Sequence, residues 1–378
     1  MVMLCGVCLL FLPMCATLLA TELPEVPPTE SSAFMPASPA ELISPALDGS
    51  PTVGLDHRAT SVARDDQTTL FVDLLYWKLT EGSAENWAQE ITPQGLGTSY
   101  GTAQLVDAPF QWNAGLRVGA SRQDSTEPFD TALYYTHYNT SAQNRAAGEV
   151  YSAFLGNFYA GNTDGTGYGP HYRSATIDWG VQFHTIDLEI GRTFEVSSSL
   201  SLRPFVGLKS AIIRQSIQST WLGPIDTSSE TYLFDSATEN LNQNFWGIGP
   251  AIGVEARIPL RQTPRSSLQF YAAPSGSLMY GHWDFSDRFQ TDGPTSLTFP
   301  LPTSIAINSQ SIHGAATMLR ACFGLEWRQE RDRCTTTLRA GYEAQVWLNQ
   351  MQYYSFNMGR LNNLMALQGG TFEFELAF

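Results

Sequence analysis

Charged side chains recur at alternate positions in several stretches of this sequence, with apolar residues between them. In MLRACFGLEWR (318–328), Arg320, Glu326 and Arg328 share one parity and the bulky apolar residues take the other. A two-residue period is that of a β-strand, so such charges gather on one face of a sheet. Thirteen residues fall on this predicted inward face: Asp73, Arg117, Asp187, Glu189, Arg203, Lys209, Glu255, Arg257, Arg320, Glu326, Arg328, Arg339 and Glu343.

Charges of both signs on one enclosed face have two interpretations, and both stay open at this point. They can line an aqueous channel and set its ion preference. They can also pair between strands as a salt-bridged plug in a narrow barrel.

Patterns of catalysis or metal binding are weak in this chain. The six histidines have no spacing typical of a zinc site. The Gly-rich stretch GNTDGTGYG (161–169) lacks the Lys-Ser/Thr of a phosphate-binding loop. His184 has outward parity near a strand end, as an outer-membrane lipid hydrolase would require, but no serine is clearly paired with it. The sequence predicts no enzyme, no cofactor and no metal.

The overall composition narrows the class of protein. The 378 residues carry a formal net charge of -15 with a pI near 4.7, which excludes an extended basic face for nucleic acid. Charged residues amount to 15%, below the usual value of about 25%. Aromatic residues reach 12%, too many for a disordered chain. A cytosolic enzyme is therefore disfavoured.

Three segments are predicted along the chain. Residues 1–20 form an apolar run that predicts a secretory signal, although no Lys or Arg precedes it; an N-terminal membrane anchor is the alternative. Residues 21–67 are rich in Pro, Ser and Thr and predict a disordered periplasmic linker. Residues 68–378 form the folded domain.

The folded domain is predicted to be all-β. About ten segments show the two-residue period, near 68–79, 112–120, 129–139, 185–194, 202–212, 246–258, 266–282, 318–328, 334–348 and 366–378. The connections between them alternate between long (17 to 40 residues) and short (four to seven residues). This alternation is typical of an antiparallel outer-membrane β-barrel, with long extracellular loops and short periplasmic turns. Two more strands within 140–179 would make twelve. A soluble β-sandwich, with its apolar faces turned inward, is the alternative.

The last residues, TFEFELAF, fit the closing strand of such a barrel. Phe372, Phe374, Leu376 and Phe378 share the outward face. A terminal strand of this kind resembles the signal by which the outer-membrane barrel assembly machinery recognises its substrates, so that machinery is a predicted partner.

Aromatic residues near predicted strand ends suggest interfacial girdles. The candidates are Trp77, Trp87, Trp112, Tyr134, Tyr135, Trp246, Tyr280, Trp283, Trp327 and Trp347, of which Trp77 and Trp347 have inward parity. The two cysteines beyond the signal, Cys322 and Cys334, are predicted to be free thiols, because a turn near 330–331 puts Cys322 opposite Arg339, too far from Cys334 for a disulfide.

Several stretches resemble the Legionella-type pore-forming outer membrane proteins, which are similar to chlamydial major outer membrane proteins. The resemblance is carried by FVDLLYWKLTEG (71–82), WNAGLRVGAS (112–121), HTIDLEIGRTFEVSSSLSLRPFVGLKSAII (184–213), FWGIGPAIGVEARIPL (245–260) and the terminal strand. It implies a secreted β-barrel that forms a channel, and no catalytic residues.

The predicted function is therefore an outer-membrane pore for passive diffusion of small hydrophilic solutes or ions. The alternative is a non-conducting structural or adhesive barrel, with a lipid hydrolase as a third class. Predicted partners are outer-membrane lipid, the assembly machinery and the permeating solutes, with no nucleic acid; an oligomer is possible.

Overall fold

The computed structural model describes residues 67–378, except 94–100, 125, 153–154, 156–170, 227–230, 298–299, 332–333 and 356–358. The predicted signal and linker lie outside the described residues. Within this range the chain is almost entirely antiparallel β-sheet, with one short 3₁₀ helix, η1 (Gly82–Asn86). No helix in the described part of the chain is long and apolar enough to span a membrane.

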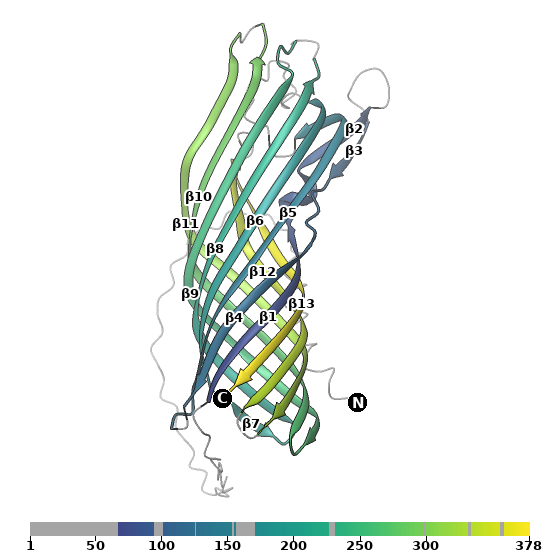
Figure 1. Ribbon diagram of the computed structural model, residues 1–378. Coiled ribbons are helices and arrows are strands. Elements are labelled where there is room, and N and C mark those ends of the chain that lie inside the picture. Colours follow the sequence, from purple (N-terminus) through teal and green to yellow (C-terminus); the bar gives the residue numbers. More distant parts are fainter. Residues whose placement is uncertain are drawn as a thin grey trace, which may run out of the picture. The chain divides into compact units, whose positions relative to one another are not determined.

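Ten strands form a closed ring (Figure 1). In ring order they are β1 (Gln67–Glu81), β4 (Trp112–Gln123), β5 (Asp130–Ser152), β6 (Tyr172–Gly191), β8 (Leu200–Pro224), β9 (Ser236–Thr263), β10 (Ser266–Pro294), β11 (Pro302–Glu330), β12 (Thr335–Ser355) and β13 (Gly359–Ala377). The first and last strands pair along thirteen residues, which leaves no open edge in this part of the wall. The predicted ten-stranded all-β barrel is confirmed.

Three short strands lie outside the ring. β2 (Ala88–Pro93) and β3 (Gly101–Val106) form a hairpin that pairs with the far end of β5. β7 (Phe194–Ser197) pairs with the start of β8.

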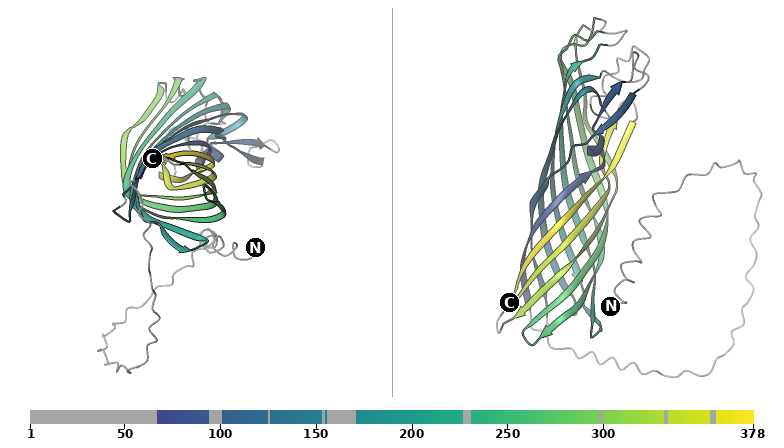
Figure 2. Two further views of the ribbon diagram at one scale, coloured as in Figure 1. Left: turned by 60° about the horizontal axis from the view of Figure 1, so that its bottom comes forward. Right: turned by 90° about the vertical axis from the view of Figure 1, so that its right-hand side faces the viewer.

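The strands are strongly staggered around the ring. Following directly paired residues once around the barrel leads from Trp246 to Ile258, twelve positions further along the same strand, β9. A stagger of this size tilts the strands steeply against the barrel axis, as Figure 2 shows. A ring of ten strands is only slightly wider than the eight-stranded barrels that side chains fill completely.

An apolar surface surrounds the outside of the ring. Leucine, isoleucine, valine and aromatic side chains stand outward on every ring strand, for example Leu74 (57% exposed), Ile252 (67%) and Phe323 (50%). The inward positions alternate with them and are largely buried. Polar inside and apolar outside is the arrangement of a barrel in lipid, so a soluble sandwich is excluded.

The strands are longer than about ten residues, which contradicts the predicted extents. β8 to β11 run 25 to 29 residues each, and much of the predicted loops 140–179, 217–243 and 284–312 is strand. Six neighbouring strands, β5, β6, β8, β9, β10 and β11, therefore continue beyond the 12-residue β4 and the 15-residue β1 (Figure 1). We call these six strands the extended wall. The extensions were missed because their many Ser, Thr, Asn and Gln residues weaken the apolar alternation.

Candidate functional site: the barrel lumen

An arginine at the centre of the lumen connects three strands. Arg117 on β4 donates through Nη1 to Asp73 Oδ2 on β1 (2.8 Å) and through Nη2 to Glu343 Oε1 on β12 (2.9 Å). Arg320 on β11 donates to the second oxygen of Glu343 (2.9 Å). Thr136 accepts from Arg117 Nε (3.1 Å), so the guanidinium is bonded on every side. Glu343 is fully buried and Asp73 is 2% exposed, so this central cluster is largely buried and salt-bridged.

A second cluster lies closer to the chain terminus. Arg339 on β12 pairs with Glu326 (2.7 Å), Glu373 (3.0 Å) and Glu375 (3.1 Å), and reaches Glu255 on β9 at 3.6 Å. β9 and β12 are separated in the ring by β10 and β11, so this contact crosses the lumen. Arg257 bonds Glu255 (2.6 Å) and approaches Glu326 (3.8 Å), which joins the two sides of the lumen into one network.

Two smaller groups complete the charged lining. Lys209 on β8 pairs with Asp187 on β6 (2.5 Å). Arg203 binds Asp130 through Nε and Nη2 and contacts Glu189 through Nη1 (3.3 Å). Each group joins neighbouring strands of the extended wall across the ladder.

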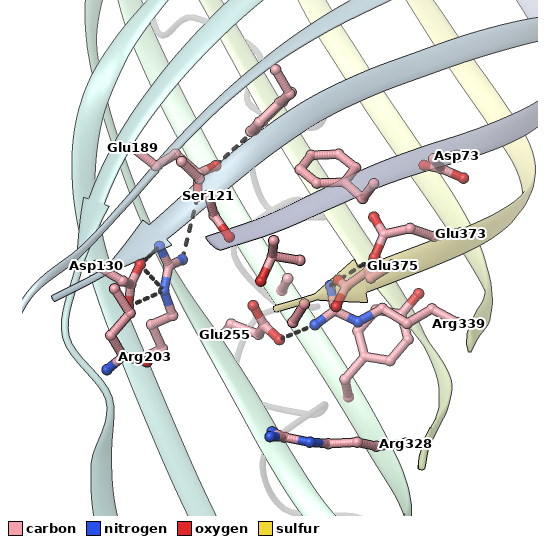
Figure 3. Close-up of a pocket in the computed structure, with 18 of the residues that line it drawn as sticks. Asp73, Ser121, Asp130, Glu189, Arg203, Glu255, Arg328, Arg339, Glu373 and Glu375 are labelled. Atoms are coloured by element: carbon pink, nitrogen blue, oxygen red, sulfur yellow. Dashed lines mark hydrogen bonds and ion pairs between the residues drawn. The ribbon is translucent and has the colours of Figure 1, made fainter. Parts of the chain in front are cut away.

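A cavity of about 550 Å³ opens between these clusters at the end of the barrel that carries the C-terminus (Figure 3). We call it the vestibule. Its lining mixes the paired charges with Ser121, Tyr134 and Tyr271. Arg328 lines the vestibule and contacts Glu330 at 3.5 Å, and Figure 3 shows it apart from the bonded groups. The vestibule is therefore polar, charged and reachable from one end.

The other half of the lumen has a different filling. Beyond the charged clusters, inward positions carry large rings, including Trp77, Phe183, Phe245, Trp283 and Trp347, each no more than 1% exposed. Phe183 meets Trp347 edge to face at 5.4 Å and Phe245 meets Trp283 at 4.8 Å. These rings belong to one continuous hydrophobic cluster, which we call the aromatic core.

Two inward-folded segments help to build the aromatic core. The first is η1, where Ser83 accepts from Asn363 Nδ2 (2.5 Å) and donates to Tyr353 (3.4 Å). The second follows Asn349, whose φ of 55° bends β12, with a register shift in its pairing to β13 between Trp347 and Met351.

The bend is held by bonds to the opposite wall. The Gln350 carbonyl oxygen accepts from Gln243 Nε2 (2.7 Å) and from Trp283 Nε1 (3.0 Å). The Gln352 backbone N–H donates back to Gln243 Oε1 (3.1 Å). We call Asn349–Tyr353 the inner bend.

Sequence comparison agrees with this architecture. The family model described as "Legionella pneumophila major outer membrane protein precursor" matches residues 64–378. The chain belongs to that family. It is accordingly a protein of the cell outer membrane, and its apolar outer surface contacts lipid.

Other comparisons add little to the family assignment. The crystal structure of the Pseudomonas putida toluene transporter TodX aligns at 9% identity, with a TM-score of 0.25 over 84% of this chain and 90% of that chain. A Pseudomonas aeruginosa FadL homologue aligns at 10% identity, with a TM-score of 0.24 over 85% and 91%. Values this low support no conclusion about function. No curated protein matches the sequence.

The thirteen predicted lumen charges of this family member all stand on inward-facing positions. The structure joins twelve of them in the bonded clusters described above, and among the described residues Arg328 has one long contact, with Glu330. Their part in conduction stays a prediction. Asp130, Glu373 and Glu375 belong to the same clusters but were missed. The alternation of Glu373 and Glu375 with Phe372 and Phe374 was the signal that would have found the last two.

The predicted assembly residues stand on the outer surface. Phe372, Phe374, Leu376 and Phe378 are 37 to 59% exposed. Phe378 exchanges two backbone hydrogen bonds of 2.9 Å with Thr68, so the last residue is locked to the first described strand. Recognition by the assembly machinery stays a prediction.

The predicted aromatic girdle is only partly correct. Trp112, Tyr135, Trp246, Tyr280 and Trp327 are outward and exposed. The other residues of that set are inward: Trp77, Trp87, Tyr134, Trp283 and Trp347. Parity indicates this for Trp77 and Trp347 alone, since Trp87 lies in the predicted loop 80–107 and Trp283 lies just beyond the predicted strand 266–282.

The predicted cysteine register was off by four positions. Cys322 pairs directly with Glu343 instead of Arg339, because the turn between β11 and β12 includes residues 331–334. Both Cys322 and Cys334 are free thiols, as predicted.

Proposed function

We propose that this outer-membrane barrel is a narrow pore for small hydrophilic solutes or ions, held closed in this conformation by the aromatic core and the inner bend. The vestibule carries the proposal. An aqueous, charged cavity of about 550 Å³ that enters a barrel from one end suits the entrance of a permeation path.

The contrast in lumen filling supports the proposal. Burying an ion pair costs desolvation that apolar packing does not, and replacing such pairs by apolar residues is often neutral or stabilising. A barrel needed only as a structural body could fill its lumen mainly with apolar side chains, as it does beyond Trp77 and Trp347, where rings predominate although Glu81, Glu239 and Asp287 are also buried. Charges kept at thirteen inward positions therefore favour a part in solute passage.

The closing element is a bent part of β12 that enters the lumen, and identified side chains anchor it to the opposite wall. Gln243 and Trp283 supply the described side-chain bonds between the inner bend and the opposite wall. Withdrawal of the inner bend would remove Met351 and Gln352 from the lumen without breaking the ring, which is closed by β1 and β13 below that level.

A second candidate function is a non-conducting structural barrel. The observation in its favour is the buried central cluster, where Arg117 and Glu343 bridge the lumen with at most 5% exposure. A small solute could pass only if that cluster also rearranges.

Planar-bilayer recording of the purified, folded protein distinguishes the pore from the non-conducting structural barrel. The pore predicts stepwise conductance that is infrequent in the wild type. Gln243→Ala combined with Trp283→Phe removes both donors to Gln350 and is expected to raise the open probability. Asn244→Ala with Trp246→Phe is the matched control, because both residues stand on the outer face of the same strand, β9. Silence of all variants at high protein load would favour the structural barrel.

A further inference from the structure

The outer face of the barrel carries the same constellation of side chains twice. On β5 and β6, Tyr135 Oη lies 2.8 Å from His184 Nδ1, which lies 3.2 Å from His137 Nδ1. On β10 and β11, Tyr280 Oη lies 2.8 Å from His313 Nδ1, which lies 3.1 Å from His282 Nδ1. In each case the two histidines are directly opposite in the ladder. We call them the β5–β6 pair and the β10–β11 pair.

The spacing within each pair suits a shared cation. Two nitrogens that each lie about 2.0–2.1 Å from one tetrahedral Zn²⁺ are about 3.3 Å apart. The Nδ1 atoms are already 3.1 and 3.2 Å apart, with a phenol oxygen beside them. Imidazole is a preferred ligand of Zn²⁺, Cu²⁺ and Ni²⁺.

The groups that contact the outer ring nitrogen, Nε2, of His282 in the β10–β11 pair favour metal binding. Asp284 Oδ2 lies 3.1 Å from His282 Nε2, and Ser311 donates to the other oxygen of Asp284 (2.7 Å). A carboxylate only accepts, so His282 carries its proton on Nε2 and presents a lone pair at Nδ1. A histidine fixed by a carboxylate on its far nitrogen is the usual arrangement behind a metal ligand.

The groups around the β5–β6 pair disfavour metal binding. The Asn139 amide nitrogen lies 3.2 Å from His137 Nε2 and donates to it, so the proton of His137 is on Nδ1, where it bonds His184. Arg214 also stands on the outer face, next to Ile212, the ladder partner of His184. His137 therefore offers no lone pair at Nδ1, in contrast to His282, and the β5–β6 pair has a positive charge near it.

We propose that the β10–β11 pair is a binding site for a divalent transition-metal ion such as Zn²⁺, with His282 and His313 as ligands through Nδ1, Tyr280 as a third donor and Asp284 as the positioning residue. In the described part of the chain no three His, Cys, Asp or Glu side chains converge on one point. The site is therefore a two-histidine site completed by the phenol and water, and it binds more weakly than a site with three protein ligands of that kind. Tyr280 is 55% exposed, so the ion has access from outside.

A direct test is titration of the folded, untagged full-length protein in detergent with ZnCl₂ by calorimetry, with Cu²⁺ electron paramagnetic resonance as a second measurement. The wild type is expected to bind one Zn²⁺ at this site and to give a Cu²⁺ spectrum with coupling to two imidazole nitrogens. His313→Ala removes a ligand and is expected to abolish both signals. Asp284→Asn is expected to weaken binding by about tenfold, the low end for loss of a supporting carboxylate.

The β5–β6 pair supplies the matched control within the same molecule. His184→Ala is expected to leave Zn²⁺ binding and the Cu²⁺ spectrum unchanged, and heat-modifiable gel migration checks that each variant is folded. The proposal is overturned if the wild type binds no Zn²⁺, if His313→Ala binds as well as the wild type, or if His184→Ala loses as much binding as His313→Ala.

Discussion

The two halves of the lumen are filled by different kinds of side chain. At the C-terminal end, inward positions carry Arg, Glu, Asp and Lys around a cavity of about 550 Å³. Toward the extended wall they carry mainly Trp and Phe in a continuous core, with Glu81, Glu239 and Asp287 also buried there. The alternation of faces is the same in both halves, but the pairing of β1 with β13 ends at Glu81 and Met365, and η1 and the inner bend enter the lumen beyond that level. The difference therefore arises from side-chain choice and from the end of the closed ring together.

The comparison shows which half is tied to the ring and which is tied to movable segments. Arg117 and Arg339 connect only ring strands, β1, β4, β9, β11, β12 and β13, by charge. The aromatic core instead packs against η1 and the inner bend, which enter the lumen from the connections. Breaking an ion pair in the charged half should destabilise the folded barrel. Disturbing the packing of the aromatic core should instead open the lumen.

The largest effect is expected from Arg117→Met. The substitution leaves Asp73 and Glu343 buried without their shared cation, and breaking a buried ion pair in this way costs about 3–5 kcal/mol. Urea unfolding of the barrel in detergent or lipid measures the loss. A free energy of unfolding within 1 kcal/mol of the wild type would show that the central cluster is hydrated and that the comparison fails in this half.

Phe245→Ala is expected to have the next largest effect. It removes a ring that packs on Trp283 at 4.8 Å in the aromatic core, and such truncations cost about 3 kcal/mol or more in a closed core. Because the core is attached to the connections, we expect added conductance in planar bilayers together with the lower stability. Loss of stability without any conductance would assign the core a structural role alone.

Gln243→Ala tests the inner bend and is expected to have a smaller effect than Phe245→Ala. It removes one of the two donors to the Gln350 carbonyl oxygen and the Gln243 acceptor for Gln352 N–H, and the loss of these two buried hydrogen bonds costs about 1–3 kcal/mol in total. Amide hydrogen exchange is expected to accelerate at Gln352 and neighbouring residues, while that of β1 and β13 stays unchanged. Equal acceleration throughout the ring would show that the bend is not an independent unit.

Arg328→Met should have the smallest effect. Its side chain is 36% exposed and its contact with Glu330 is 3.5 Å, so the pair contributes within about 0.5 kcal/mol. The same unfolding experiment as for Arg117→Met serves here, and the two variants control for each other. A loss near that of Arg117→Met would mean that stability is spread evenly over the lumen charges.

The sequence predicted the outer and inner faces of the barrel better than the contents of its lumen. A two-residue period in stretches such as 318–328 decides the face of every residue in a strand, so all thirteen charges were placed on the correct side. Partners across the lumen, such as Arg339 and Glu255, depend on the stagger of the whole ring. No local pattern contains that quantity.

The aromatic core was hidden for a different reason. Trp87 lies in the predicted loop 80–107, and Trp283 lies directly before a stretch, DFSDRFQ (284–290), where Ser, Asp and Gln stand among rings and a loop is predicted. In lipid the outward face must be apolar, but above the membrane it is free to be polar. The apolar residues there point inward, so the outward alternation that marks a membrane strand is absent.

The central claim is that water enters the lumen from the C-terminal end and stops at the aromatic core. Labelling with a hydrophilic maleimide tests it in a background where Cys322 and Cys334 are replaced by serine. A cysteine at Ser121, which lines the vestibule, is expected to react readily, and one at Ser219, which is fully buried on β8, at least about tenfold more slowly because labelling there needs a local opening. Equal rates at the two positions in the folded barrel would contradict the account.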